Sequence, residues 1–63
     1  MITAPLEGAD LVVIADYSPL WFDELQLRVG ERVTFLSEIC TGWFKGRIGN
    51  KIGVFPGTHV RPA

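Results

Sequence analysis

Hydrophobic residues in this 63-residue chain occur in short runs, and turn-forming residues separate those runs at close intervals. The run 11–14 is continuous and rich in β-branched residues, which predicts a strand. Leu25, Leu27 and Val29 alternate with polar residues, as expected for a strand with one buried face. Further strands are predicted at 32–36, 43–48 and 51–55. Pro56 ends the last of these and opens a single 3₁₀ turn over 56–59, after which Val60 closes the barrel. The pattern leaves no room for a helix of useful length and predicts an all-β fold, a small barrel of five strands.

Turn signals indicate where these segments connect. Ser18-Pro19 opens a loop over 18–24, with Trp21 and Phe22 near its tip, and 37–42 is the next predicted loop. Gly49-Asn50 separates two strand segments by two residues, which is the signature of a tight β-hairpin. The barrel is therefore expected to carry one long loop with aromatic residues at its outer end.

Side-chain parity predicts which residues face the core. Successive strand residues point to opposite faces, and Lys45 and Arg47 must face water. Trp43 shares their parity, so it should face outward, where a large aromatic side chain is typical of recognition. Phe44 has the opposite parity and should face inward. The predicted core consists of Leu11, Val13, Leu25, Leu27, Val33, Phe35, Ile48, Phe55 and Val60.

Composition and charge narrow the function classes. One domain is the only sensible count for 63 residues, and 48% hydrophobic residues suit a folded globule. The formal net charge of −1 argues against nucleic acid or an anionic membrane as the main partner, because both need a basic surface. All seven acids lie before residue 39, and only bases follow. We therefore expect the early loops to offer an acidic patch to a basic ligand.

The sequence carries no sign of an active site. It has one histidine and one cysteine, and it lacks metal-ligand spacing, a phosphate-binding glycine loop and a nucleophile elbow. No catalysis, cofactor or metal is expected. Cys40 has no partner to form a disulfide within the chain, so we interpret it as inert and the compartment as a reducing cytoplasm. No apolar run approaches the roughly 18 residues of a membrane span, and residues 1–10 lack the features of a signal peptide.

Five motifs resemble the SH3 domain family, and they occur in the family's order and spacing over nearly all of residues 11–61. The resemblance is carried by Val13-Ile14-Ala15-Asp16-Tyr17, Asp23-Glu24-Leu25, Leu27 to Glu31, Gly42-Trp43-Phe44-Lys45-Gly46, and Gly53 to Val60. It implies an SH3-type barrel of two orthogonally packed antiparallel sheets, with a 3₁₀ turn before the last strand. The implied boundaries are a flexible lead-in over 1–10, the domain over 11–61 and a tail at 62–63.

The resemblance also implies a function. SH3 domains bind proline-rich segments in the polyproline II conformation, which is already extended and loses little entropy on binding. Their acidic loop residues pair with an Arg or Lys beside the prolines. Position by position, Tyr17, Trp43 and Pro56 match the groove of the family. Asp23 and Glu24 match the acidic pair, with Glu24 at the more usual cation-binding position.

Three groove positions depart from the family pattern. Ala15 replaces the first Tyr of the opening motif, His59 replaces the Tyr of the ending, and Val54 replaces an aromatic residue. The proline slot that Ala15 and His59 would line is expected to be shallower or differently shaped. We hypothesise that Trp21, Phe22 or both turn towards the groove and supply the missing apolar surface. The alternative is that one of them packs beneath its loop.

The expected function is a protein-interaction module of a cytoplasmic adaptor or scaffold, monomeric in isolation, whose ligand is a proline-rich segment with a flanking Arg or Lys. Because one slot is altered, a second possibility is an SH3 domain that binds a non-proline segment, a folded protein or an intramolecular segment through the same face. A nucleic-acid-binding barrel is the third class, since Lys45 and Arg47 share a strand with Trp43. The acids near the expected groove oppose it.

Overall fold

The computed structural model describes residues 4–63. Its elements are β1 (Asp10–Val13), β2 (Arg32–Cys40), β3 (Trp43–Ile48), β4 (Lys51–Pro56), the 3₁₀ turn η1 (Gly57–His59) and β5 (Val60–Pro62). All strand pairs are antiparallel, in the order β4-β3-β2-β1-β5. The all-β class, the five strands and the 3₁₀ turn before the last strand are confirmed.

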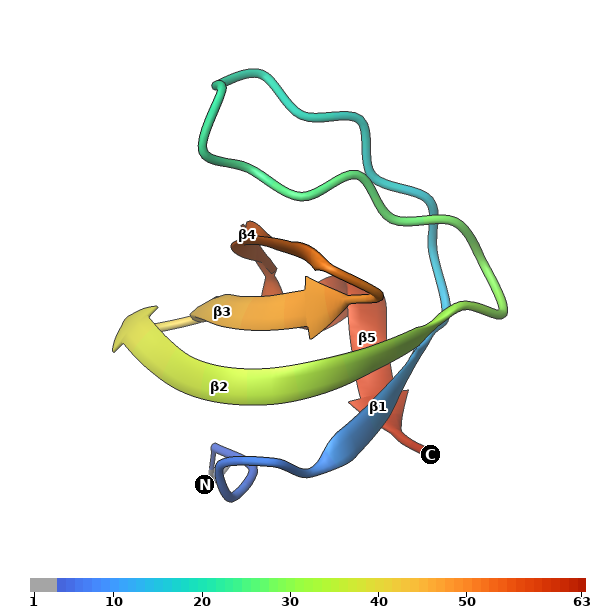
Figure 1. The fold of residues 1–63 in the computed structure, drawn as a ribbon, viewed down its shortest axis with the longest axis vertical. Coiled ribbons are helices and arrows are strands. Elements are labelled where there is room, and N and C mark those ends of the chain that lie inside the picture. The colour runs from blue at the N-terminus through green and yellow to red at the C-terminus, as the bar shows by residue number, and fades with distance from the viewer. Residues whose placement is uncertain (1–3) are drawn as a thin grey trace.

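The strands form one continuous hydrogen-bonded sheet, because β2 pairs with β1 through one half and with β3 through the other. Figure 1 shows β2 curving along β3 and towards β1. Register shifts between Phe35 and Ser37 and between Glu38 and Cys40 interrupt the β2–β3 ladder, and such irregularities bend a strand. The two packed sheets implied by the resemblance are thus two parts of one curled sheet.

A long loop, residues 14–31, joins β1 to β2 and stands above the barrel (Figure 1). The prediction of a strand at 25–29 is wrong, because the two arms of the loop form a single isolated β-bridge, between Tyr17 and Leu27, and no continuous ladder. Leu27 is buried, as the alternation predicted. Val29 is 62% exposed, because the chain turns at Gly30, which has a φ of +94°.

The predicted loop at 37–42 is also wrong over most of its length. β2 continues to Cys40, which pairs with Trp43, and only Thr41 and Gly42 form the turn. The hairpin at Gly49-Asn50 is confirmed, since Ile48 pairs with Lys51. Gly49 has a φ of +62° and Asn50 has a negative φ, which fits the type II′ turn that matches the twist of the strands.

The buried core lies inside the curl of the sheet. It comprises Leu11, Val13, Leu25, Leu27, Val33, Phe35, Phe44, Phe55 and Val60. Ile48, predicted as a core residue, is only half-buried at the end of β3 and packs against this cluster. Phe44, which parity pointed inward, is buried instead, and its ring stands edge-on to Phe35 and Phe55 at centroid distances of 5.1 and 6.1 Å.

Both ends of the described chain contact the barrel. The Gly8 amide donates to the Phe35 carbonyl at 2.7 Å, and Ala4 and Ala9 pack against the core. At the other end Pro62 belongs to β5, and the Ala63 amide donates to the Asp10 carbonyl at 3.1 Å. Residues 1–3 of the expected lead-in lie outside the described residues.

Candidate functional site

Three aromatic side chains from distant parts of the chain form a row on the surface. The Tyr17 ring stands edge-on between two others, 6.3 Å from the Trp43 ring and 5.5 Å from the His59 ring. Both distances lie within the range of favourable aromatic pairs. Pro56, half-buried on β4, pairs directly with Trp43 of β3. The structure therefore brings four of the predicted site residues together.

Local sequence explains how each member reaches this row. Lys45 is exposed on β3 and Trp43 has the same parity, so the indole is turned out of the core and is half-buried. The 3₁₀ turn presents His59 immediately after β4. The turn packs closely against Phe44 because Gly57 has no side chain. A Cβ at Gly57 would lie 2.8 Å from the Phe44 ring. The His59 Nδ1 lies 3.1 Å from the Thr58 hydroxyl, which restricts rotation of the imidazole ring.

Glu24 organises the tip of the long loop. Its Oε1 accepts hydrogen bonds from the Tyr17 hydroxyl at 2.9 Å, the Leu20 amide at 2.7 Å and the Trp21 amide at 3.3 Å. The bond from Leu20, above all, lowers the pKa of the Glu24 carboxyl, and the bonds from Tyr17 and Trp21 add to the effect. Desolvation, and then the hydrogen bond and charge of Glu24, raise the pKa of the Tyr17 phenol. Glu24 thus fixes the orientation of Tyr17 in the row.

Asp23 differs from its neighbour Glu24. Its backbone carbonyl accepts the Val54 amide at 3.0 Å, which ties the loop to β4, and its side chain is exposed. No hydrogen bond to the Asp23 carboxylate is recorded among residues 4–63. Of the predicted acidic pair, Asp23 is therefore the carboxylate with both oxygens open to a ligand.

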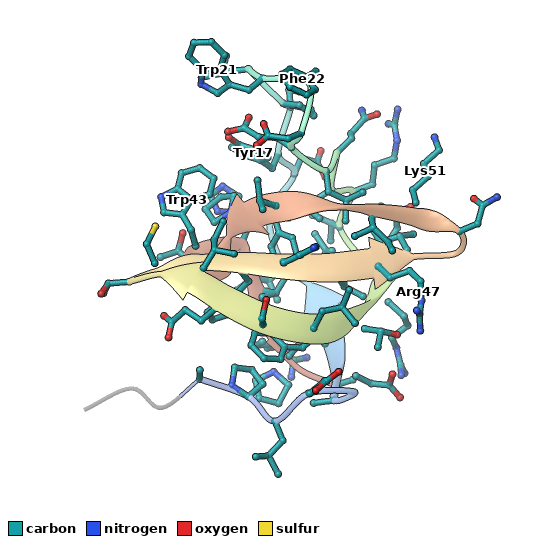
Figure 2. All side chains as sticks on the ribbon, turned by 60° about the vertical axis from the view of Figure 1, so that its left-hand side comes forward. Tyr17, Trp21, Phe22, Trp43, Arg47 and Lys51 are labelled. Carbon is teal, nitrogen blue, oxygen red and sulfur yellow. The ribbon has the colours of Figure 1, made fainter. Side chains whose placement is uncertain are left out.

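Trp21 and Phe22 are both on the surface. They are 68% and 101% exposed, so the alternative that one of them packs beneath the loop is wrong. Figure 2 shows both rings at the outer end of the loop, with Trp21 on the same side as Trp43. The two tryptophans line one open hollow of about 450 Å³. Trp21 and Trp43 thus border the same hollow, and a role of Trp21 in ligand binding stays a prediction.

The sequence interpretation missed two residues of this hollow, Ile39 and Cys40. They were assigned to a loop, whereas they are the exposed end of β2 and line the hollow together with Trp21. The sequence does contain a signal for the longer strand, because a tight turn at Thr41-Gly42 pairs Cys40 with Trp43 and so extends β2 to Cys40. Cys40 is a free, exposed thiol.

Two of the departing positions, Ala15 and Val54, lie next to residues that contact the row or its hollow. The Ile14 amide donates to the His59 carbonyl at 2.8 Å, so Ala15 follows directly on a contact with η1. Val54 is half-buried, forms a bridge with Glu24 and lines the hollow beside the two tryptophans. A small side chain at Ala15 leaves His59 and Tyr17 as the only rings at that end of the row among the described residues.

Two further observations concern residues 4–63, the part of the chain that the structure describes. No cluster of three or more His, Cys, Asp or Glu side chains is arranged to hold a metal ion there. None of the helical segments in that part of the chain has the length and hydropathy to cross a membrane.

Comparison with known proteins agrees with the fold. Residues 12–57 match the family model described as SH3 domain. Mouse CD2-associated protein is 43% identical over 49 residues, covering 78% of this chain and 8% of that protein. The SH3 domain of yeast NBP2 superposes with a TM-score of 0.86 at 28% identity, covering 89% of this chain and 98% of that one. An Entamoeba histolytica myosin IB C-terminal SH3 domain, solved with a bound peptide, gives a TM-score of 0.82 at 25% identity, covering 94% of this chain and 98% of that one.

This chain spans only 6–17% of the length of curated relatives such as CD2-associated protein and mitogen-activated protein kinase kinase kinase 11. The match is therefore to one module of each relative. SH3 domains are in general non-catalytic modules for protein interaction. The family match over residues 12–57, together with the five-stranded curled sheet and its 3₁₀ turn, shows that this chain belongs to the SH3 domain family.

Proposed function

We propose that this domain binds a proline-rich segment of another protein in the polyproline II conformation, along the row formed by His59, Tyr17, Trp43 and Pro56. The observation that carries the proposal is the packing of the Tyr17 ring between those of His59 and Trp43. Spaces beside such edge-on rings suit proline rings, and an extended ligand is ordered at little entropic cost. The peptide bound to the Entamoeba SH3 domain supports this use of the fold.

A flanking Arg or Lys of the ligand is proposed to pair with Asp23. Glu24 was the expected partner, but its Oε1 already accepts three hydrogen bonds. Trp21 forms the outer wall of the hollow that continues from Trp43, next to Asp23. The ligand would thus be bound by its prolines at the row and by its cation at the loop.

The parent protein is proposed to be a multidomain adaptor or scaffold of the cytoplasm. The chain is a small fraction of CD2-associated protein and of its other relatives, which supports a module within a longer chain. We expect the contact to be small, below about 1,200 Å² in total, as in transient signalling encounters. The isolated domain is expected to be a monomer. We expect it to have no catalytic activity and no affinity for nucleic acid or membranes.

NMR titration tests the proposal. Proline-rich peptides with a flanking Arg should shift the Trp43 indole and Tyr17 signals, and Trp43→Ala should weaken binding at least tenfold, as for a central aromatic residue of an interface. Lys45→Ala is the matched control, since Lys45 is an exposed residue of the same strand. If no proline-rich peptide shifts these signals at millimolar concentration, the proposal is wrong.

The Asp23 assignment has its own test. Asp23→Asn should weaken an Arg-flanked peptide severalfold and leave the same peptide with Ala in place of Arg unaffected, because only the first loses an ion pair. Isothermal titration calorimetry measures both. An equal loss for the two peptides would show that Asp23 acts through the structure of the loop.

A second candidate function is binding of a non-proline segment or a folded protein through the same face. The exposed side chains of Trp21 and Ile39 favour this candidate, because they give the hollow an apolar surface that a ligand's Arg or Lys would not cover. Trp21→Ala distinguishes the two. Under the main proposal it lowers affinity for proline-rich peptides without loss of stability, whereas no change in peptide affinity would favour the second candidate.

A further inference from the structure

The hollow beside Trp43 is lined by four segments of the chain. The long loop contributes residues 21–24, and the three strands β2, β3 and β4 contribute Ile39, Cys40, Trp43 and Val54. The hollow has a volume of about 450 Å³ and continues from the aromatic row, because Trp43 belongs to both. A ligand segment that lies along the row therefore reaches the hollow where it runs past Trp43.

Most of the side chains that line this hollow are large, apolar and at least partly exposed. Trp21, Phe22 and Ile39 are exposed, and Trp43 and Val54 are half-buried. In Figure 2, Trp21 and Trp43 lie on the same side of the molecule. Single exposed apolar residues are ordinary, whereas apolar side chains gathered at one place on the surface mark a site of interaction. The lining therefore indicates a ligand group that covers apolar surface.

The charges of the lining restrict what that group can be. The only charged residues in the lining are Asp23 and Glu24, and both belong to the long loop. The Glu24 Oε1 already accepts three hydrogen bonds, whereas the Asp23 carboxylate is exposed, so a cation of the ligand pairs at the loop. Within residues 4–63, the part of the lining that the strands contribute holds no charged group. That part suits an apolar side chain, and the two carboxylates disfavour an acidic one.

Hydrogen bonds hold the segments around the hollow in place. The Val54 amide donates to the Asp23 carbonyl at 3.0 Å, which ties the loop to β4. The turn between β2 and β3 is closed by the Gly42 amide, which donates to Oε2 of Glu38 at 3.1 Å. A preformed site loses little conformational entropy when it is occupied, so a side chain that covers its apolar surface increases affinity.

We propose, on the basis of the proposed function, that the partner segment carries a large apolar side chain such as Leu, Met or Phe beyond its prolines, and that this side chain occupies the hollow. It contacts Trp21 and Ile39, while the cation of the ligand pairs with Asp23. Ile39 is thereby a specificity-determining residue, which selects among proline-rich segments by the residue that follows the prolines at the Trp43 end of the row. The ligand class is a proline-rich core with an apolar residue and a cation on one flank.

A set of peptides with one proline-rich core tests the inference by calorimetry. The flanks of the reference peptide are Ala, and Leu replaces Ala in turn at each of the three positions beyond either end of the core. We expect one position at which Leu raises the affinity about fivefold or more, because part of its apolar surface is covered. Glu at that position should bind more weakly than Ala. In NMR spectra, the Leu peptide should add shifts at Trp21 and Ile39 to those at Tyr17 and Trp43.

Variants of the domain separate the apolar contact from the ion pair. Ile39→Ser should remove most of the gain from Leu and leave the affinity for the reference peptide unchanged, which also shows that the variant is folded. Ile52→Ser is the matched control, because Ile52 is 55% exposed on β4, Ile39 is 52% exposed on β2, and Ile52 does not line this hollow. It should keep the full gain. Asp23→Asn should weaken peptides with a flanking Arg and leave the gain from Leu unchanged.

Three results would overturn the inference. If Leu gives no gain at any position while the reference peptide still binds at the row, the hollow does not select an apolar side chain, and the proposed function is unaffected. A gain from Leu that persists in the Ile39→Ser variant would place the Leu side chain elsewhere. An equal gain from Arg at the same position, with the same shifts at Ile39, would assign the hollow to the cation alone.

Failure of the proposed function gives a different result, because the reference peptide tests it separately. If that peptide shifts neither Tyr17 nor Trp43, binding of the proline-rich core is wrong. Leu peptides that still shift Trp21 and Ile39 would then support the apolar ligand of the hollow, and Leu peptides that shift nothing would overturn both proposals.

Discussion

The carboxylate of Glu24 accepts hydrogen bonds from one side chain and two backbone amides, and all of them converge on Oε1. One residue thereby connects the aromatic row, through Tyr17, to the shape of the loop that carries Trp21. The adjacent Asp23 fixes the loop only through its backbone and keeps its carboxylate exposed. At the scale of the residue, Glu24 is therefore structural, and Asp23 is the acid that we propose for recognition of a ligand cation.

Glu24→Gln is expected to destabilise the domain in a pH-dependent way. The hydrogen bonds lower the pKa of Glu24 in the folded state below its ordinary value of 4.5, so the stabilisation is present above that pH and is lost as the pH falls through the lowered pKa. The difference in free energy of unfolding between the unchanged domain and the variant should therefore shrink below that pH. Urea denaturation at a series of pH values measures it.

Glu7→Gln is the matched control, because Glu7 is exposed and no hydrogen bond to its side chain is recorded among the described residues. It should leave the free energy of unfolding unchanged throughout the series. A Glu24→Gln difference that stays constant from neutral to acidic pH would contradict the assignment of the stabilisation to the ionised carboxylate.

At the scale of the element, β3 packs closely against the core through a glycine. A Cβ on Gly46 would lie 2.8 Å from a ring carbon of Phe55, 2.8 Å from a methyl group of Val33 and 2.9 Å from the Thr34 carbonyl oxygen. The motif Gly-Trp-Phe-Lys-Gly was informative as a family resemblance, and Gly46 shares the inward parity of Phe44. The reason for a glycine there is visible only when β2 and β4 lie on either side of β3.

Gly46→Ala should therefore destabilise the domain by about 1–3 kcal/mol, the usual cost of overfilling a packed core. Chemical denaturation measures the free energy of unfolding. Lys45→Ala, next to it on the exposed face of β3, should change stability little. A Gly46→Ala variant as stable as the unchanged domain would mean that the Phe55 ring can move aside without cost.

At the scale of the whole molecule, the sequence places acids early and bases late, and the fold turns this order into two faces. The long loop carries four acids, Asp16, Asp23, Glu24 and Glu31, and one base, Arg28, while the charged residues of the β3–β4 hairpin are all cations. The acidic loop suits a basic ligand at the row. It leaves the net charge of the chain at −1.

Salt should therefore weaken binding of an Arg-flanked proline-rich peptide. Raising ionic strength from about 0.01 M to about 1 M shortens the Debye length from roughly 30 Å to roughly 3 Å. We expect affinity to fall by up to about fivefold, the worth of an exposed ion pair. Calorimetry at both ionic strengths measures it. The same peptide with Ala in place of Arg should be nearly insensitive, and an equal fall for both peptides would rule out the ion pair.

The sequence by itself determined the fold class, the hairpin at Gly49-Asn50, the 3₁₀ turn and most of the core. It also determined that Trp43 faces outward. These features depend on local chemistry, namely the two-residue period of strands, the positive φ of glycine in a tight turn and the missing amide hydrogen of proline. The errors at 25–29 and 37–42 arose because a strand exists only where a partner strand pairs with it, and local alternation does not reveal the partner.

Only the tertiary structure decided what surrounds the outward Trp43. It placed His59 and Tyr17 in one row, and it brought Trp21 and Ile39 to the lining of one hollow. It also showed that one oxygen of Glu24 is shared among three donors. These contacts join residues that are far apart in the sequence or adjacent with different orientations, so they depend on how the long loop folds back over the sheet.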